Sequence, residues 1–517
     1  MRGGSVRKIV EAFQKPAWKS MVYGLGGSQK HALFAAAYDA ARRPLAIVTH
    51  SAEALEAWRE DLASLLPDAK ILELPELDMM EVEATAKGME RMAARMGILG
   101  RLLRREPVIV LARAASAVQK GLSRQDFERL SLRLETGANI GREHLLARLV
   151  ELGYEANGEV EGIGQFSARG GIVDVFPLNA PRPLRIEFFD DEIDSLREFD
   201  TATRRSVGNV PSAVVLPVGR TAGAESAAGA APFLSYIEGE GAVVFDEPLR
   251  TREAAMRLVK ENPESKGRLF SWEELVAATG ENATFFAALM LQKIHGAEPD
   301  SLVSLSVQAV APFQRQMDML KNEARSWLAA GQHVLLLLGD AEKAASMREF
   351  FAKSRIPSAV IEEGDSLGDA YLNILTGTLG NGFELPEARL IVIAERDIFG
   401  RQKKKLVKQA SKEERIAHFR EINVGDYVVH VNHGIGKYLG VETLDVGGIK
   451  RDYLHIKYGG DDKLFVPTDQ VGLLQKYIGS EGETPRLHRM GGTEWVKAKA
   501  RARASVEDIA DELIALY

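Results

Sequence analysis

Short apolar runs alternate with longer stretches of helical pattern over the first part of this chain. The apolar runs predict strands at residues 20–25, 44–50, 69–75 and 107–112. An amphipathic stretch follows the second of these runs, and Ser51 is its predicted N-cap. Apolar strands between helices are typical of a parallel sheet that is covered on both faces. The pattern therefore predicts an α/β domain over residues 1–118.

The pattern changes after residue 118. Over residues 119–215, a short helical stretch precedes runs in which apolar and polar residues alternate, which predicts an antiparallel sheet in a small α+β domain. Residues 216–300 return to an apolar strand and helices that could complete the first sheet, so that the small domain is an insertion. The α/β rhythm resumes over residues 301–400 and predicts a further α/β domain.

The rest of the chain has three segments of different character. Residues 401–422 are a charge run without a core pattern, which favours a solvated linker. Residues 423–485 contain short apolar runs between glycine-containing turns, which suits a small all-β barrel of the SH3 or Tudor kind. Residues 486–517 have the pattern of a long amphipathic helix whose apolar face needs a packing partner. We therefore expect a multidomain α/β chain that is the front part of a longer protein.

Composition narrows the class of protein. The chain has 517 residues, which is too long for a single core, and its net charge of −7 means that nucleic acid would have to bind at a local basic patch. It has no cysteine, which excludes disulfides, thiolate zinc sites and cysteine nucleophiles and suits a reducing compartment. No apolar run is long enough to cross a bilayer and no signal sequence opens the chain, so we expect a cytoplasmic protein without a membrane partner.

The sequence GLGGSQKH, which begins at Gly24, resembles the phosphate-binding template G-x-x-x-x-G-K-[ST]. Gly24 and Lys30 are in register with the template and Gly27 adds to the glycine content, but Gln29 replaces the second glycine and His31 replaces the hydroxyl residue. A glutamine side chain crowds the approach to phosphate, and imidazole is a poor ligand for magnesium. The loop is therefore a working site, a decayed site or a plain glycine-rich turn.

Two further groups are weak candidates for metal binding. Asp246 and Glu247 end an apolar run and could hold magnesium in a nucleotide-binding fold, although a strand followed by a solvated acidic turn is the more common arrangement. His430 and His433 have no further carboxylate or thiolate ligand nearby in the sequence, so we predict no metal site there.

Long sequence segments resemble one known family. Residues 430–470 resemble the RNA-polymerase-interacting domain of the bacterial transcription-repair coupling factors (Mfd), which is shared with CarD-type regulators. Residues 169–200 resemble the part of that family and of the excision-repair protein UvrB that binds UvrA. The sequence AERDIFGR, at 394–401, resembles the end of the family's domain before the polymerase-binding barrel. The resemblance runs in order over essentially the whole chain.

This resemblance implies a function in transcription-coupled nucleotide excision repair. The front module is similar to UvrB, and the family is expected to have lost hydrolysis at this loop, so the resemblance favours a decayed site. It implies an adaptor that binds UvrA and the β subunit of RNA polymerase, as a monomer and without a cofactor or catalysis of its own. In the family, ATP and magnesium serve a DNA translocase that displaces polymerase and contacts double-stranded DNA, and the motifs of that translocase do not follow in this sequence.

For UvrA binding, the family match carries over to Arg169, Arg185 and Phe189. Arginine gives a forked donor for carboxylates and is enriched at interface hot spots. Alternation places Arg185 and Phe189 on one face of their strand, and it predicts that the core face carries Leu184, Ile186 and Phe188. Without the family match, Phe189 would be expected in a local core and Arg185 would pair with one of the two aspartates that follow Phe189.

For polymerase binding, the candidates are Lys450, Arg451, Leu454 and Ile456, because a barrel strand of the family lies beside a strand of the polymerase β subunit. Pairing at a strand edge uses main-chain hydrogen bonds for affinity and alternate side chains for specificity. Leu454 and Ile456 share one face and could equally be barrel core.

Two other functions compete with the adaptor hypothesis. One is a residual nucleotide hydrolase of the UvrB type that uses Lys30 with Asp246 and Glu247, against which the identities of Gln29 and His31 argue. The other is a CarD-like transcription regulator, which would leave the long UvrB-like module without a role.

Overall fold

The structure is a computed structural model with two compact units, residues 1–402 and residues 403–517. It describes residues 4–77, 86–201, 203–218, 230–237, 239, 241–261, 267–362, 364–368, 370–400, 424–430, 434–446, 449–460, 462–467, 474–476 and 487. The predicted linker at 401–422 lies outside these residues, and so does the predicted long helix at 486–517 apart from residue 487.

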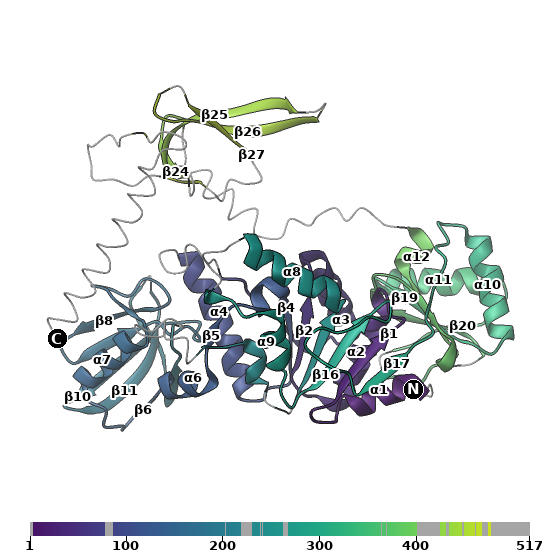
Figure 1. Cartoon of the computed structure of the whole chain (residues 1–517), viewed down its shortest axis with the longest axis horizontal. Coiled ribbons are helices and arrows are strands. Elements are labelled where there is room, and N and C mark those ends of the chain that lie inside the picture. The colour runs from purple at the N-terminus through teal and green to yellow at the C-terminus, as the bar shows by residue number, and fades with distance from the viewer. Residues whose placement is uncertain are drawn as a thin grey trace. The chain divides into compact units, whose positions relative to one another are not determined.

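A parallel sheet of seven strands, in the order β17-β1-β16-β15-β2-β4-β3, forms the first domain (Figure 1). Its strands are β1 (Lys19–Tyr23), β2 (Leu45–Thr49), β3 (Lys70–Leu74), β4 (Val108–Arg113), β15 (Ala242–Asp246), β16 (Ala283–Ala288) and β17 (Ser301–Ser304). Residues 1–118 and 216–300 thus build one sheet, as the strand pattern suggested. The predicted further domain over 301–400 begins after residue 304, because β17 pairs with β1 in the first sheet. The short pattern of β17 gave no sign of that long-range partner.

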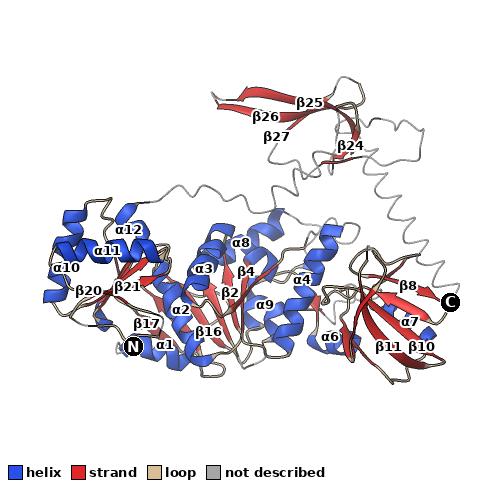
Figure 2. Cartoon of the chain, turned by 180° about the vertical axis from the view of Figure 1, so that it is seen from behind, coloured by secondary structure: helices blue, strands red, loops and turns tan. Residues whose placement is uncertain are grey.

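Helices cover both faces of this sheet, as the uninterrupted apolar strands predicted (Figure 2). One face packs on α1 (Gly4–Ala12), α2 (Ser28–Ala41) and α3 (Ala52–Leu65). The other face packs on α4 (Ala86–Leu103), α5 (Ala114–Ala117), α8 (Pro248–Glu261) and α9 (Trp272–Ala277). Ser51 is the N-cap of α3, as predicted, and its side chain accepts from the Ala54 amide at 3.2 Å.

The second domain is inserted between β4 and β15. Its sheet has the order β12-β11-β10-β9-β8-β7, and only the β7–β8 pair is parallel among its described pairings. The sheet strands are β7 (Glu155–Ala156), β8 (Gln165–Arg169), β9 (Ile172–Val175), β10 (Leu184–Phe189), β11 (Glu192–Phe199) and β12 (Ser206–Asn209). Helix α7 (Arg142–Glu151) covers one face, since Leu145 and Leu149 are buried in one cluster with Leu184 and Ile186.

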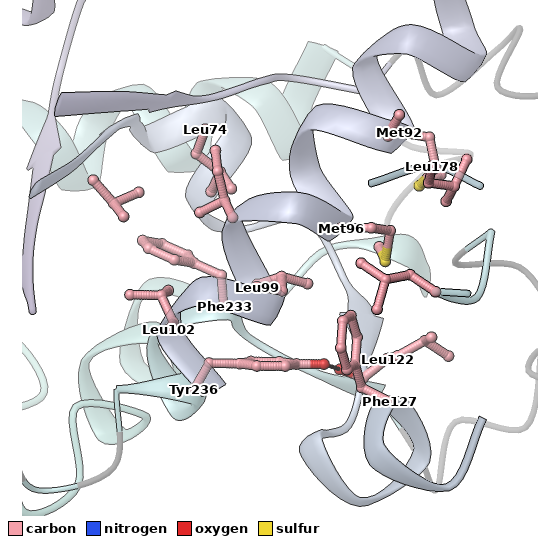
Figure 3. Packing of buried hydrophobic residues seen from close by; sticks show 14 of the residues in the cluster. Leu74, Met92, Met96, Leu99, Leu102, Leu122, Phe127, Leu178, Phe233 and Tyr236 are labelled. Atoms are coloured by element: carbon pink, nitrogen blue, oxygen red, sulfur yellow. Dashed lines mark hydrogen bonds between the residues drawn. The ribbon is translucent and has the colours of Figure 1, made fainter. Parts of the chain in front are cut away.

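Short elements connect the second domain to the first. They are β5 (Gly121–Leu122), α6 (Arg124–Leu130), β6 (Leu132–Glu135), β13 (Ser212–Val215), β14 (Ala230–Ala231) and the 3₁₀ helix η1 (Phe233–Tyr236). Figure 3 shows the apolar face of α4 against Phe233 and Tyr236. The Tyr236 hydroxyl donates to the Leu122 carbonyl at 2.9 Å, and its ring meets Phe127 edge to face at 5.7 Å. One continuous core therefore joins the two domains.

A buried arginine lies at this junction. Arg95 of α4 is 1% exposed and donates to the main-chain carbonyls of Pro75 at 3.1 Å, Ser116 at 3.1 Å and Gln119 at 3.4 Å. Desolvation lowers the pKa of its guanidinium to about 10, so the group stays charged at neutral pH. Because its N–H groups donate to carbonyls at the ends of β3 and α5, Arg95 holds in place the segment through which the chain passes from the first domain to the second.

The third domain has a mixed sheet in the order β18-β22-β23-β19-β21-β20. Its strands are β18 (Gln308–Ala309), β19 (His333–Leu338), β20 (Ser358–Val360), β21 (Leu372–Thr376), β22 (Phe383–Leu385) and β23 (Leu390–Ala394). Its helices are α10 (Met317–Ala329), α11 (Ala341–Lys353), the short 3₁₀ helix η3 (Pro386–Ala388) and α12 (Glu395–Phe399). The four strands β19, β20, β21 and β23 are parallel, as an α/β domain requires.

The second unit contains an antiparallel sheet of five strands, in the order β27-β26-β25-β24-β28. These are β24 (Tyr427–His430), β25 (Gly434–Val446), β26 (Ile449–Lys457), β27 (Lys463–Pro467) and β28 (Leu474–Lys476). The described pairings do not join β27 to β28, so they show an all-β sheet and not a closed barrel. Within the described ranges, no helix is long and apolar enough to cross a membrane.

Replacing Arg95 by alanine should destabilise the first domain. The change leaves buried carbonyls without donors, which is expected to cost roughly 2–4 kcal/mol of unfolding free energy. Urea unfolding followed by circular dichroism measures the loss. Arg91→Ala is the matched control, one turn earlier on an exposed site of α4, and should stay within about 0.5 kcal/mol of the parent chain. Equal stability of the two variants would contradict the role of Arg95.

Candidate functional site

The loop that resembles a phosphate-binding loop connects β1 to α2. Gly24 and Gly27 have φ values of 86° and 77°, in the left-handed region that favours glycine. A Cβ at Gly24 would lie 2.1 Å from the Leu305 carbonyl oxygen, so no larger residue fits there. Gly27 is the N-cap of α2 and offers no side-chain hydrogen bond to the first turn. The strand, glycine loop and helix expected of a phosphate loop are therefore present.

The lysine of this loop is already paired inside the protein. Lys30 Nζ lies 2.5 Å from Asp246 Oδ1 at the end of β15, and the other carboxylate oxygen accepts from Trp58 Nε1 at 3.0 Å. Lys30 is 8% exposed and Asp246 is 1% exposed. Asp246 ends a strand as predicted, but it is buried rather than solvated. The cation that would face a phosphate is neutralised by a neighbouring carboxylate.

His31 stands where the template has a metal-binding hydroxyl. Its Nδ1 lies 2.6 Å from Asp61 Oδ2, and its ring centroid lies 4.2 Å from that of Trp58. Burial lowers the pKa of His31, and the hydrogen bond and charge of Asp61 offset only part of that effect. His31 is therefore neutral at pH 7 and donates to Asp61. The sequence did not indicate that Trp58 and Asp61 belong to this site, because both lie on α3, the helix that follows α2 and β2 in the chain.

A cavity of about 280 Å³ lies beside the loop. Its lining includes His50, Arg250 and Leu289, and its volume is just below the roughly 300–1,000 Å³ typical of small-molecule sites. Glu247 also lines it, with φ of 48°, and its side chain accepts from the Leu289 amide at 3.2 Å. Space for a small group thus remains, but the loop groups that would bind phosphate and magnesium are occupied or replaced.

The predicted UvrA-binding strand β10 alternates as expected. Leu184 is 2% exposed and Ile186 is fully buried, so they lie on the core face, and Phe188 is partly buried against the same core. Phe189 points away from that core and is 79% exposed. The alternative that Phe189 packs in a local core is therefore wrong.

Arg185 lies on the same side of β10 as Phe189, away from the core. Its Nε and Nη2 donate to the two carboxylate oxygens of Asp174, each at 2.8 Å, and its guanidinium lies 4.7 Å from the centre of the Phe199 ring. The predicted alternative of a pair with the aspartates after Phe189 is also wrong. The partner belongs to β9, where Asp174 is directly opposite Arg185, and the sequence gave no register for that pairing.

Arg169 lies on the same side of the sheet as Arg185 and Phe189. In the strand register, Arg169 of β8 is opposite Ile172, which is opposite Glu187 of β10. Since Glu187 and Arg185 are two residues apart on one strand, all three predicted residues lie on the same side of the sheet. Arg169 is exposed and donates to Glu159 at 2.8 Å. We call Arg169, Arg185 and Phe189 the outward face.

The structure separates the four predicted polymerase contacts into two pairs. Leu454 is 1% exposed and Ile456 is fully buried, in a core cluster with Val428, Tyr438, Tyr458 and Val466. Their side chains belong to the core, which is the alternative that the sequence left open for both residues. Lys450 and Arg451 lie opposite Asp445 and Leu444 of β25, and their side chains are outside the described residues. His433 also lies outside them, as does the His430 side chain.

We expect that the loop from Gly24 to His31 does not bind nucleotide. In a titration of this chain with a fluorescent ATP analogue and magnesium, we expect no saturable signal, because Asp246 holds Lys30 and the magnesium-binding hydroxyl is replaced by His31. Lys30→Ala is the control and, at a temperature where circular dichroism shows it folded, should likewise give no saturable signal. A saturable signal in the parent chain that Lys30→Ala abolishes would contradict the decayed loop.

Two domain families match this chain. Residues 132–220 match the UvrB interaction domain, and residues 422–478 match the CarD-like/TRCF RID domain. The first match contains the outward face and the second contains β24 to β28. A solved hypothetical ATP-dependent RNA helicase from Sulfolobus tokodaii aligns with a TM-score of 0.22 and 11% identity over 73% of this chain and 78% of its own, too low a similarity to bear on the fold.

Curated relatives match almost the whole chain. The transcription-repair-coupling factor of Bacillus subtilis (strain 168) is 31% identical over 99% of this chain and 49% of its own length. That of Staphylococcus aureus (strain MRSA252) is 30% identical over 96% of this chain and 48% of its own length. The chain thus spans about half the length of these relatives. The predicted resemblance is confirmed: along nearly its whole length, this chain is homologous to about half of a transcription-repair-coupling factor.

Proposed function

We propose that this chain is a nucleotide-independent adaptor in transcription-coupled excision repair. Its second domain binds UvrA through the outward face, and its second unit binds the β subunit of RNA polymerase. The chain acts as a cytoplasmic monomer and catalyses no reaction itself. Displacement of polymerase by ATP-driven translocation on double-stranded DNA is assigned to a separate motor region, in keeping with relatives about twice as long as this chain.

The observation that carries this proposal is the exposure of Phe189. A phenylalanine that is 79% exposed at the end of β10 leaves a large apolar surface in water, and an aromatic beside an arginine is a composition enriched at interfaces. Arg185 is held in one orientation by Asp174 and Phe199, so little side-chain entropy would be lost on binding. The match of residues 132–220 to the UvrB interaction domain supports UvrA as the partner.

The main chain of β26 supports the polymerase contact. Strand β27 pairs with Tyr453–Lys457 only, whereas β25 pairs with the whole of β26 from Ile449 to Lys457. The described pairings of residues 449–452 are therefore all with β25, and we infer that a strand of the partner pairs with their other edge. We therefore assign polymerase binding to the main-chain edge of β26 that carries Lys450 and Arg451, rather than to the side chains of Leu454 and Ile456.

The two competing functions have less support. A hydrolase of the UvrB type needs Lys30 to face a phosphate, and Lys30 is paired with buried Asp246. A regulator of the CarD kind would use the second unit alone, whereas the curated relatives cover 96–99% of this chain. The adaptor hypothesis gives a role to both units.

Phe189→Ala should weaken UvrA binding without unfolding the second domain. Because the ring is exposed, its removal costs little stability, and we expect a loss of roughly 2 kcal/mol, or about thirtyfold in Kd. Calorimetric titration against UvrA measures it. Val150→Ala is a matched control, 54% exposed on α7 at the opposite side of the sheet, and should leave Kd unchanged. Equal Kd for the parent chain and Phe189→Ala would count against the proposed surface.

Charge reversal at Arg451 should separate polymerase binding from folding of the small sheet. Arg451→Glu is expected to weaken capture of RNA polymerase with an unchanged melting curve, because its site lies beyond the part of β26 that β27 covers. Leu454→Ala should instead destabilise the sheet by roughly 2–5 kcal/mol, since it removes a buried core side chain. Lys463→Glu, at an exposed position of β27, is the control for charge reversal. Unchanged capture by Arg451→Glu would rule out this edge.

A further inference from the structure

We propose that the Gly377–Gly382 loop of the third domain is an internal ligand of the former phosphate loop, and that it takes over the role of a nucleotide in linking two α/β domains. The loop connects β21 to β22 and lies against the start of α2 and the C-terminal part of α3. The two domains would then keep one fixed arrangement whether or not nucleotide is present. This inference does not depend on which partners the chain binds.

Three main-chain amides of this loop donate to side chains of the first domain. The Thr378 amide donates to Ser64 Oγ at 2.7 Å, the Gly380 amide to Asp61 Oδ1 at 2.7 Å, and the Asn381 amide to Ser28 Oγ at 2.9 Å. Phosphate loops use the start of the helix and nearby hydroxyls to bind phosphate and metal. In this chain the Ser28 hydroxyl in the first turn of α2 accepts from protein instead.

His31 is a positioning residue in this arrangement. Asp61 binds His31 Nδ1 through one carboxylate oxygen and the Gly380 amide through the other. Asp61 is 2% exposed, and a buried carboxylate needs its oxygens satisfied. The residue that displaced the metal-binding hydroxyl therefore orients the acceptor for the third domain.

Apolar packing and small residues make the contact close. Leu379 is 7% exposed, and its cluster also contains Ala32 of α2, Leu65 of α3 and sheet residues of the third domain. A Cβ at Gly380 would lie 3.0 Å from Ser28 Oγ, and one at Gly377 would lie 3.2 Å from Ser64 Oγ. These glycines let the loop backbone reach its acceptors. Besides this contact, Ser5 donates to Glu387 in an exposed pair between α1 and η3.

A distance measurement across the two domains tests the proposal. The chain has no cysteine, so Arg257→Cys on α8 and Ala345→Cys on α11 give two unique, exposed positions for spin labels. Double electron–electron resonance then reports the distribution of distances between the first and third domains. For the parent sequence we expect one narrow distribution that does not change when ATP and magnesium are added.

Two variants break the contact from opposite sides. Asp61→Ala removes the acceptor of the Gly380 amide, and Gly380→Val wedges a side chain against Ser28 without altering the first domain. Both should broaden the distribution severalfold, and circular dichroism checks that they fold. Gly208→Val is the control, because a Cβ there meets nothing within 4 Å. A broad or nucleotide-sensitive distribution in the parent, or a narrow one in a folded Gly380→Val, would overturn the proposal.

Discussion

The buried ion pair between Lys30 and Asp246 is the contact on which this molecule depends. It joins the first turn of α2 to the end of β15, two segments that lie on either side of the inserted second domain in the sequence. Removing one partner of such a pair leaves an uncompensated buried charge, at a typical cost of about 3–5 kcal/mol. The same pair removes from the loop the free cation that a nucleotide would need. One interaction thus joins the two parts of the first sheet across the insertion and pairs the lysine of the loop that resembles a phosphate loop.

Around this pair, the side chains beside the glycine loop form a junction between protein groups. Trp58 donates to Asp246 and packs on His31, and His31 donates to Asp61, whose second oxygen accepts from the third domain. Each of these groups is satisfied by another protein group. A module built in this way has a stable shape without a ligand, which is the property that an adaptor needs. The outward face of the second domain is likewise fixed in advance, because Asp174 and Phe199 hold Arg185 in place.

Local patterns in the sequence predicted the features that depend on local structure. The apolar runs gave β1, β2 and β4, Ser51 was found as the cap of α3, and alternation separated Phe189 from Ile186. Pairings between distant segments were missed. Nothing near Arg185 in the sequence pointed to Asp174, and nothing in the pattern of β17 pointed to the first sheet. Leu454 shows a second limit of the sequence. Alternation along its strand fits a core face and an interface face equally well, and only the burial of Leu454 in the structure identifies the core face.

The central claim is that this chain alone joins the two machineries. Mass photometry of the chain mixed with UvrA and core RNA polymerase, without added nucleotide, tests it directly. The adaptor proposal predicts a species whose mass equals the sum of all three components, and predicts its loss when the chain is left out. If only pairwise complexes form, or if none includes this chain, the chain is not an adaptor and the claim is wrong.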